Sequence, residues 1–330
     1  MRFARVFLLV ALAATIAAVS LATAWLTRPL ALSGETAEVS VEPGRSPREI
    51  ADAWVRAGVQ TSPLLLYEWF RWSGQSRRIR AGSYEIARGT TPISLLNKMV
   101  RGDETLAVVR LIDGWTFKQF RAELARADSL KPTTAAMSDA DIMAALGEPE
   151  VPAEGHFYPD TYAYSKGSSD LAVLRRARHA MQKRLDAAWA QRAPDTPLRT
   201  ADEALILASI IEKETGTPAD RGKVAAVFVN RLRVGMPLQT DPTVIYGLGE
   251  RFDGNLRKRD LVTDGPYNTY LRAGLPPTPI SMPGKASLLA AVKPEPIKAL
   301  YFVSRGDGSS EFSDNLAAHN RAVDKYQRGR

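Results

Sequence analysis

The longest apolar run of the chain lies at its amino terminus. Residues 6–26 carry no charge; Arg2 and Arg5 precede them and Arg28 follows. At about 1.5 Å per residue, a helix of this length crosses a hydrocarbon core of about 30 Å. The short basic tail predicts a cytoplasmic amino terminus. Residues 1–28 are therefore expected to form a cytoplasmic tail and a single-pass membrane anchor, with the body of the protein on the far side of the membrane from the cytoplasm.

A cleaved signal peptide is the alternative, because Ala22-Thr23-Ala24 resembles a small-residue cleavage site. The anchor is favoured, since the apolar run exceeds the usual signal-peptide core of about 7 to 15 residues. In both cases the body of the protein is exported.

A series of short elements follows between Ala37 and Ile86. Alternating apolar residues predict a strand near Val39 and Val41, and Ser46-Pro47-Arg48-Glu49 is a capping box with proline at the first helical position. A second helix is predicted from about Ser62 to Trp72, and a strand returns at 82–86. This order, strand-helix-helix-strand, resembles a LysM-like module, a fold that in many proteins binds glycans containing N-acetylglucosamine.

The aromatic residues of this segment allow two interpretations. They offer surfaces on which sugars stack, but aromatic groups at helical spacing more often belong to a core, and the core is favoured. The residues concerned are Trp69, Phe70, Trp72 and Tyr84. With the helix expected from Thr90 to Arg101, the module and its connecting helix occupy residues 37–104.

Residues 105–330 are predicted to form a larger α+β domain. A β-rich run covers Leu106 to Ile112, and a polar, aromatic loop covers Glu154 to Tyr164. Loops of this kind often build sites on a rigid scaffold, although simple packing over the core is the alternative. Helices are expected around 116–126, 139–146, 170–190, 287–292 and 315–327, and a hairpin joins 300–304 to 311–313.

The clearest single element is a helix between Thr200 and Gly216. Thr200-Ala201-Asp202-Glu203 is a capping box, and Gly216 is a natural stop. Residues 204–211 are apolar almost all round, which predicts a buried helix. Glu212 then continues the face of Leu205, Ala208 and Ser209, whereas Glu214 points to the opposite side.

The apolar helix desolvates Glu212, and the last turn places it near the negative end of the helix dipole. Both effects disfavour ionisation, and a protonated carboxyl group is what glycosidic cleavage requires of a general acid. Taken alone, Glu212-Lys213-Glu214 also fits a solvated helix end. The surrounding motifs decide between the two interpretations.

The amino-acid composition limits the kinds of ligand and partner that the protein is expected to bind. The net charge of +8 suggests attraction to an anionic surface, yet no basic run with interleaved aromatics and no nucleic-acid module is present. Cysteine is absent, and the three histidines lack metal-ligand spacing. Neither a metal nor a cofactor is expected.

Several motifs surround the helix in a fixed order. Glu212-Lys213-Glu214-Thr215 is followed by Asn230-Arg231-Leu232, by the run from Leu238 to Gly247, by Tyr267-Asn268-Thr269-Tyr270 and by Gly274-Leu275-Pro276-Pro277. This set closely resembles the YceG-like family of endolytic murein transglycosylases. The Glu154 to Tyr162 segment, Tyr301-Phe302-Val303 and the 315–320 segment fit the same family, so the resemblance covers nearly the whole chain.

The resemblance implies cleavage of the β-1,4 bond between N-acetylmuramic acid and N-acetylglucosamine in nascent peptidoglycan strands, which would limit strand length. The family's catalytic glutamate falls on Glu212, and the product carries a 1,6-anhydro end. The resemblance also implies that the anchor lies in the inner (cytoplasmic) membrane with the body on the periplasmic or extracytoplasmic side, and that peptidoglycan synthases at this membrane are partners. Candidates for binding the glycan are Asn230, Gln239, Thr240, Asp241, Tyr246, Tyr267 and Asn268; for each, packing and backbone hydrogen bonding is the alternative role.

Asp241 has a second alternative. It is either a second catalytic carboxylate, which would make the protein a hydrolysing muramidase with two carboxyl groups, or a turn residue before Pro242. The turn is favoured. A third possibility for the whole protein is a glycan-binding scaffold of the wall-synthesis machinery that has no catalytic activity.

Overall fold

The computed structural model describes residues 2–329 of the chain. The side chains of residues 2–5 lie outside the description, and with them Arg2 and Arg5, on which the expected membrane orientation rests. The architecture is mixed α and β, as predicted. The chain divides into two compact units: unit 1 comprises residues 1–107, 128–131 and 163–168, and unit 2 comprises the remainder.

Unit 1 begins with helix α1 (Arg2–Thr27). Within it, Val6–Thr27 is long and apolar enough to cross a membrane and exposes its side chains. A membrane anchor and an amino-terminal signal sequence both have these properties.

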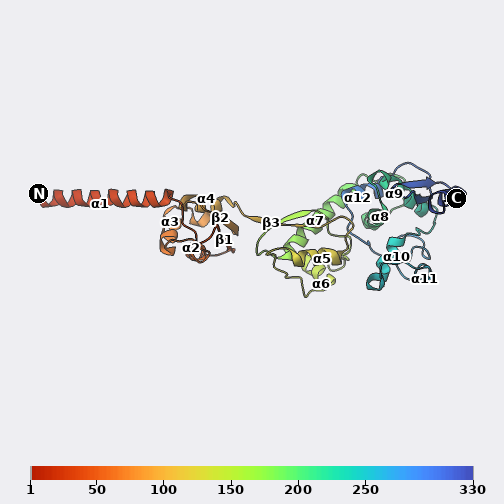
Figure 1. Cartoon of the computed structure of the whole chain (residues 1–330), viewed down its shortest axis with the longest axis horizontal. Coiled ribbons are helices and arrows are strands. Elements are labelled where there is room, and N and C mark those ends of the chain that lie inside the picture. Colours follow the sequence, from red (N-terminus) through yellow and green to blue (C-terminus); the bar gives the residue numbers. More distant parts are fainter. Residues whose placement is uncertain (1, 330) are drawn as a thin grey trace. The chain divides into compact units, whose positions relative to one another are not determined.

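The small domain of unit 1 follows the predicted order of strand, helix, helix and strand (Figure 1). Ser46 and Glu49 form the expected capping box, and an unpredicted one joins Thr91 to Ser94. The two strands pair antiparallel, with Thr36 opposite Ala87. The elements are β1 (Thr36–Val41), α2 (Pro47–Arg56), α3 (Pro63–Trp72), the 3-10 turn η1 (Ser76–Arg78), β2 (Gly82–Ala87) and α4 (Pro92–Arg101).

The aromatic residues of this domain divide between core and surface. Phe70 and Tyr84 are fully buried with Trp54, as the core interpretation predicts. Trp69 is half-buried and donates its indole N–H to the carbonyl of Pro92 at 3.0 Å. Trp72 is 79% exposed. Of the four aromatic residues considered from the sequence, only Trp72 therefore offers a largely free face.

The remaining helices and strands follow in chain order, and the predicted helices and the final hairpin are present. They are β3 (Leu106–Arg110), α5 (Phe117–Arg126), α6 (Asp139–Leu146), β4 (Thr161–Ser165), α7 (Asp170–Trp189), α8 (Ala201–Glu214), η2 (Pro218–Asp220), α9 (Arg221–Arg233), α10 (Asp241–Leu248), η3 (Gly249–Arg251), α11 (Lys258–Val262), α12 (Lys285–Val292), β5 (Tyr301–Ser304), β6 (Ser310–Ser313) and α13 (Leu316–Gln327). β3 pairs with β4, and β5 with β6.

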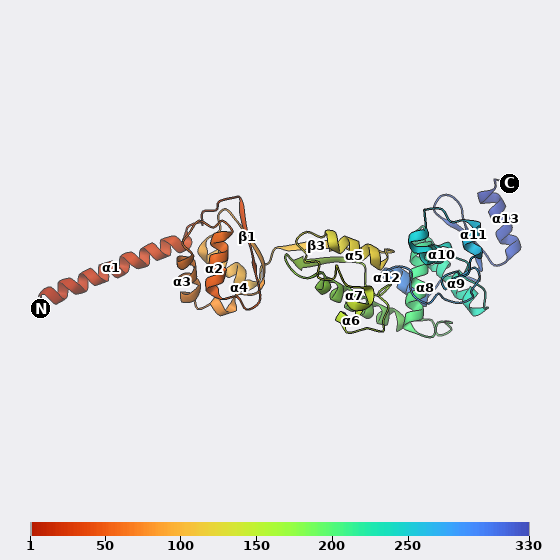
Figure 2. The ribbon, with the colours of Figure 1, turned by 90° about the horizontal axis from the view of Figure 1, so that it is seen from below.

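Helix α8 is the centre of the core of unit 2. Its apolar residues 204–211 are buried, apart from the half-buried Ile206, and the helix packs against α7, α9, α10 and α12 (Figures 1 and 2). Thr200 accepts the backbone N–H of Glu203, as predicted. The Glu203 carboxylate, however, accepts the N–H of Arg199, so the capping box is only half formed.

Two local predictions were wrong. The expected loop from Glu154 to Tyr164 contains strand β4, because Tyr162 and Tyr164 alternate with more exposed residues. Asp241 opens α10, where Pro242 occupies the first turn of a helix and not of a reverse turn. The predicted end of α8 is confirmed, because the helix stops just before Gly216: Thr215 is its extended C-cap, and its hydroxyl donates to the carbonyl of Ile211.

Candidate functional site

Glu212 lies in the last turn of α8, where the buried helix reaches the surface. Its side chain is only 10% exposed, whereas the next residue, Lys213, is exposed. The face that leads to it consists of Leu205, Ala208 and Ser209, all fully buried. The helix therefore presents one carboxyl group from an apolar interior.

Two positively polarised groups meet this carboxyl group. Its Oε2 accepts the backbone N–H of Gly284 at 2.9 Å, and Gly284 is the residue before α12. Its Oε1 lies 3.8 Å from Nη2 of Arg221, the first residue of α9. A helix amino terminus and a guanidinium group both stabilise negative charge. They oppose the effect of the apolar helix and of the carboxyl end of α8.

A second carboxyl group belongs to the same cluster. A Cβ atom on Gly284 would approach Cγ of Asp113 to 2.8 Å, so Asp113 packs directly against the residue that holds Glu212. Burial and the charge of Glu212 raise the pKa of Asp113, and Arg221 acts in the opposite direction. Asp113, Glu212 and Arg221 therefore form one cluster of two carboxyl groups and one guanidinium group.

The loop after β3 holds Asp113 in place. The N–H of Gly114 donates to the carbonyl of Met282 at 2.8 Å, and the N–H of Met282 donates to the carbonyl of Trp115 at 2.7 Å. Gly114 has φ +77°, a conformation that favours glycine, and it lies against Cγ of Glu212. These bonds fix the loop beside the end of α8.

Residues 278–284 form a stretch without helix or strand that contacts Ser209 and ends beside Glu212. Its Ile280 N–H donates to the hydroxyl of Ser209 at 3.0 Å, and the hydroxyl of Ser281 donates to the carbonyl of Ser209 at 3.1 Å. At one end, Thr278 pairs with the hydroxyl of Tyr267 at 2.7 Å. At the other end is Gly284. We call residues 278–284 the crossing segment.

A third acid, Glu154, lies near the start of the crossing segment. Glu154 accepts the N–H of Phe117, the first residue of α5, at 3.1 Å, and the hydroxyl of Tyr246 at 3.3 Å. Burial raises the pKa of Glu154 to about 7, although the Phe117 N–H acts to lower it. The next residue, Gly155, has φ +83° and packs on Pro279. Glu154 therefore links α5, α10 and the crossing segment.

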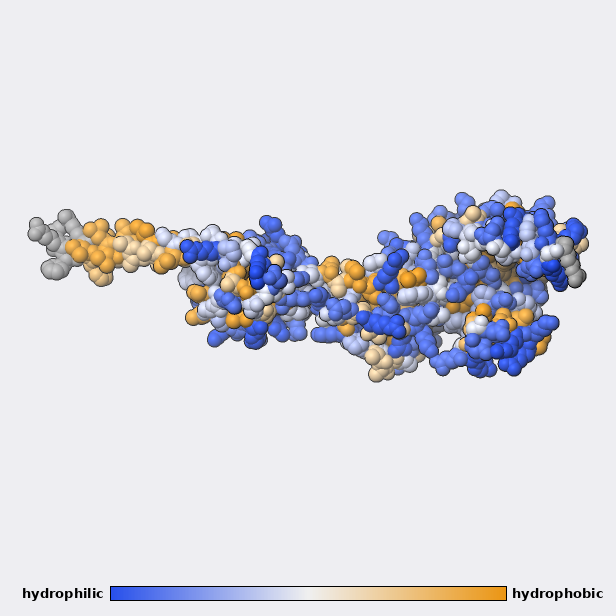
Figure 3. All heavy atoms as spheres, in the orientation of Figure 1, coloured by the Kyte–Doolittle hydropathy of each residue, from blue (hydrophilic) through white to orange (hydrophobic). Residues whose placement is uncertain are grey.

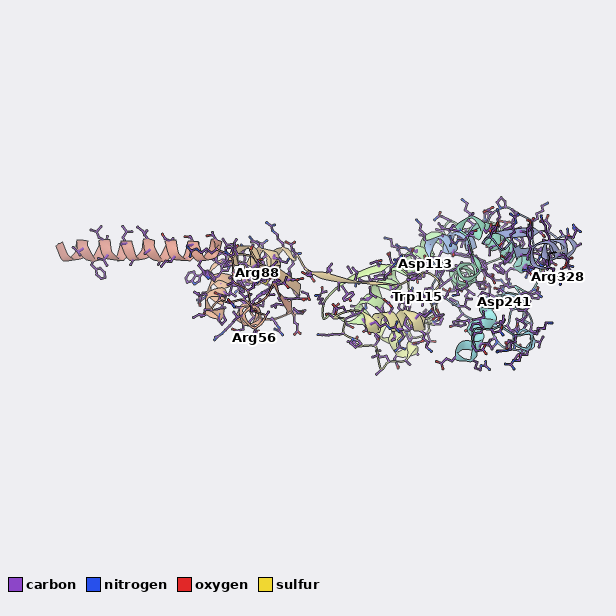
Figure 4. All side chains as sticks on the ribbon, viewed as in Figure 1. Arg56, Arg88, Asp113, Trp115, Asp241 and Arg328 are labelled. Atoms are coloured by element: carbon purple, nitrogen blue, oxygen red, sulfur yellow. The ribbon has the colours of Figure 1, made fainter. Side chains whose placement is uncertain are left out.

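Glu214 and Asp241 belong to a different cluster. Glu214 accepts the hydroxyl of Thr240, and burial raises its pKa, with the charge of Asp241 adding to the effect. Asp241 accepts the hydroxyl of Tyr270 at 2.6 Å. The end of α8 is thus no solvated tripeptide: Glu212 and Glu214 are both shielded, in different surroundings. In Figure 4, Asp241 lies apart from Asp113 and Trp115.

The other residues predicted to bind glycan fall into two groups. Asn230 and Asn268 direct their amide N–H groups to backbone carbonyls, Asn230 to Ile297 and Ala299 and Asn268 to residues 260, 261 and 263. Thr240 is buried. These contacts favour a structural role for all three. Gln239 is exposed and has φ +49°, a conformation rare outside glycine.

The last two predicted glycan-binding residues are tyrosines that contact each other. Tyr246 and Tyr267 form an edge-to-face pair with ring centroids 4.9 Å apart. Tyr246 reaches Glu154, while Tyr267 reaches the crossing segment through Thr278. They connect α10 to the crossing segment, which ends at Gly284 beside Glu212.

An open hollow of about 280 Å³ adjoins Asp113. Tyr158 contributes an aromatic ring, over which the guanidinium of Arg184 lies at 3.8 Å from the centroid. The hollow is polar and is lined by residues 110–113 and 158–161. Because the Tyr158 ring is buried and covered by Arg184, the hollow presents mainly polar and charged groups. Beside it, the cluster around Glu212 offers a shielded carboxyl group that is able to donate a proton and a second carboxyl group that is able to stabilise positive charge.

Sequence reasoning missed Asp113, Arg221 and Gly284. In the sequence, Asp113-Gly114 marks only the end of a β-rich run, and Arg221 lies in no recognised motif. The crossing segment carries one usable signal, since Pro279 and Pro283 interrupt an apolar run just after Gly274-Leu275-Pro276-Pro277.

Comparison with known proteins places this arrangement in context. The chain is 30% identical over 311 residues to the endolytic murein transglycosylase of Bacillus subtilis, covering 89% of this chain and 86% of that protein. It is 24% identical to the endolytic murein transglycosylase of Streptococcus pneumoniae, of which it spans 58%. A crystal structure of a YceG-like protein from Listeria monocytogenes superimposes with a TM-score of 0.53 at 28% identity, covering 88% of this chain and 99% of that one. The model of the YceG-like family matches residues 39–325, and the chain therefore belongs to the YceG-like family.

Proposed function

We propose that this protein is an endolytic peptidoglycan transglycosylase that cleaves the β-1,4 bond between N-acetylmuramic acid and N-acetylglucosamine inside glycan strands. The observation that carries the proposal is the setting of Glu212: one carboxyl group at the end of a buried helix, held by the Gly284 N–H and flanked by Arg221. The names of the bacterial relatives support the same activity.

In the proposed reaction, the carboxyl group of Glu212 donates its proton to the glycosidic oxygen as the bond from that oxygen to the anomeric carbon breaks. The C6 hydroxyl of the muramoyl residue then attacks the anomeric carbon, and its proton returns to Glu212. A 1,6-anhydro ring forms, and no water is consumed. One carboxyl group suffices because the nucleophile belongs to the substrate, unlike in glycosidases with two catalytic carboxyl groups.

The Gly284 N–H serves this cycle by fixing the rotamer of Glu212. Arg221 stabilises the carboxylate that remains after proton donation. In this proposal, the carboxylate of Asp113, which packs beside Gly284, stabilises the positive charge that develops at the anomeric carbon. Cleavage of nascent strands close to the membrane would end their elongation, and synthases at the membrane would supply the substrate.

A muramidase that uses two carboxyl groups is the second candidate. Because Asp113 is close to Glu212 and Asp241 belongs to another cluster, Asp113 is the better candidate for the second carboxyl group. In that case Asp113 or Glu212 would activate water, and the product would carry a reducing end. The two reactions therefore differ in a product that can be identified chemically.

We further propose that α1 stays attached as a single-pass anchor and that the body faces the periplasmic or extracytoplasmic side. The uncharged span Val6–Thr27 supports this proposal. Amino-terminal sequencing of the mature protein tests it. A mature chain that starts near Trp25 would show that α1 is removed.

The decisive experiment compares Glu212→Gln with Glu214→Gln in the full-length protein, using purified glycan strands and mass spectrometry of the products. The amide introduced at position 212 can accept the Gly284 N–H but cannot deliver a proton, so the loss should exceed the 10² to 10⁴-fold typical of acid–base catalysis. The amide introduced at position 214 can still accept the Thr240 hydroxyl, and activity should fall far less. Anhydro ends support the transglycosylase, and reducing ends the muramidase. Cleavage by Glu212→Gln at the wild-type rate would overturn the role of Glu212, and a wild-type protein that binds strands without releasing any product would indicate a scaffold.

A further inference from the structure

Unit 1 has an apolar hollow of about 590 Å³ between the last turns of α1 and helix α3. Two helices contribute its walls, and all but one of the lining residues are apolar or aromatic. They are Leu21, Ala22, Trp25 and Leu26 from α1, and Leu65, Glu68, Trp69 and Trp72 from α3. The lining residues of α1 continue an apolar surface that covers most of that helix (Figure 3).

Helix α3 is apolar on two sides. Its inner face buries Leu66 and Phe70 in the core of unit 1. Its outer face leaves Leu64, Leu65 and Trp72 exposed at 62%, 51% and 79%. Exposed apolar side chains gathered on one face mark a site that contacts a protein, a ligand or a membrane.

The position of the hollow indicates that the apolar face of α3 contacts a membrane. The span Val6–Thr27 has 22 residues, which at about 1.5 Å per residue roughly equals the thickness of a hydrocarbon core of about 30 Å. Residues 21–26 are the last turns of this span, and they share the hollow with α3. A bilayer that covers α1 to its end therefore also reaches the outer face of α3.

The connection between α1 and the small domain is short and well packed. Leu30 is buried, and its N–H donates to the carbonyl of Thr90 at 2.8 Å. Leu32 pairs with Val59 in a β-bridge, and Trp25 packs on the domain core. These contacts hold the end of α1 against the domain that carries α3.

Exposed arginines close in sequence to the lining residues suit phospholipid headgroups. Arg28 follows the span, Arg71 lies on α3, and Arg77 and Arg78 follow α3, all exposed. Arg71 lies over the ring of Trp72 at 5.9 Å from the centroid. Tryptophan is enriched where hydrocarbon meets headgroups, and arginine next to it attracts anionic lipid.

We propose that the outer face of α3, made of Leu64, Leu65 and Trp72, is inserted into the headgroup and acyl boundary of the leaflet on the far side of the membrane from the amino terminus. The proposal rests on the membrane anchoring proposed above. It assigns the small domain a second membrane contact beside the anchor, as in helices that lie in the plane of the interface. The domain is thereby held at the membrane surface in one orientation.

The absence of cysteine makes a direct test possible. Full-length Trp72→Cys and Leu65→Cys proteins are labelled with nitrobenzoxadiazole and reconstituted into vesicles of phosphatidylcholine and phosphatidylglycerol. Leu65→Cys retains Trp72 and covers the case in which loss of the indole weakens insertion. Arg56→Cys is the matched control, because Arg56 is an exposed residue at the end of α2 (Figure 4).

Labels at positions 65 and 72 should be quenched by lipids that carry a spin label near the headgroup and should be shielded severalfold from aqueous iodide. The label at position 56 should show the reverse. If iodide quenches all three labels equally, the inference is wrong. An alkaline carbonate wash separates this failure from that of the anchor: protein retained on the vesicles with iodide-accessible labels overturns only the α3 contact, whereas protein released by the wash overturns both.

Discussion

The Gly284 N–H and the carboxyl group of Glu212 are joined by a hydrogen bond of 2.9 Å, although 72 residues separate them. Gly284 has no side chain, and Asp113 occupies the space where one would lie. One residue thus sets the positions of both acids.

The first prediction is that Gly284→Ala impairs turnover while the protein stays folded. The new Cβ would come within 2.8 Å of Cγ of Asp113, so either the acid or the crossing segment must move. A shift of about 1 Å at a catalytic group costs about 10²-fold in rate. Kinetics with glycan strands measure the effect. Gly265→Ala is the matched control, because a Cβ there meets nothing within 4 Å. Equal rates for the two variants would mean that Gly284 does not position the acids.

The second prediction separates Asp113 from Asp241. Asp113→Asn should slow turnover by about tenfold to 10³-fold, because a charge pair at about 4 Å is worth up to about 4 kcal/mol and each 1.4 kcal/mol is a factor of ten. Asp241→Asn should retain most activity and lose about 1 kcal/mol of stability with the weakened Tyr270 bond. The opposite ranking, measured by product formation and thermal unfolding, would restore Asp241 as the second carboxylate.

The third prediction concerns Gln239, whose φ of +49° is strained for a residue with a side chain. Gln239→Gly should raise the melting temperature, because left-handed strain of about 1 to 2 kcal/mol exceeds the backbone entropy cost of glycine of about 0.5 to 1. If the exposed amide binds glycan, KM should rise about fivefold, the worth of one hydrogen bond. Gln239→Ala should raise KM equally without the gain in stability. An unchanged KM in both variants would show that the side chain of Gln239 does not bind glycan.

The fourth prediction is a pH dependence of stability that depends on Glu154. Its pKa is about 7 in the folded protein against an ordinary value of 4.5, so the folded state holds a proton that the unfolded state has lost between these pH values. Stability contributed by the protonated form is complete below about pH 4.5, falls as pH rises toward 7, and amounts to about 3 kcal/mol at most. Glu154→Gln should flatten this part of the profile.

Calorimetry at about pH 5 and about pH 8 measures the difference for wild type and variant. The exposed Glu150→Gln serves as control and should follow the wild type. A Glu154→Gln protein with the same pH dependence as the wild type would show that another group is responsible.

Local signals in the sequence predicted local structure well. Thr200 and the apolar residues 204–211 place a buried helix at α8, and Ser46 with Glu49 places the start of α2. These signals act between residues three or four positions apart, which is the reach of a helical turn. The same reasoning located Glu212 and the side of the helix to which it points.

The surroundings of Glu212 were not predictable in the same way. Asp113 lies 99 residues before it and Gly284 lies 72 after it, and no periodic pattern records which loops converge. The Asp-Pro pair at 241 and 242 shows a second limit, because proline suits both the first turn of a helix and a reverse turn. Tertiary packing decided between the two.

The division of the chain has a practical consequence for dissecting the protein. Unit 1 takes in residues 128–131 and 163–168 as well as 1–107. The later pieces are bonded to the first: the Ser83 hydroxyl donates to the carbonyl of Lys166 at 2.7 Å, and the Lys166 ammonium reaches Glu38 at 2.9 Å. A fragment cut after residue 107 leaves the buried Ser83 hydroxyl without its acceptor. Residues 1–107 are therefore no independent module, and a chimaera that transplants them must carry both later stretches.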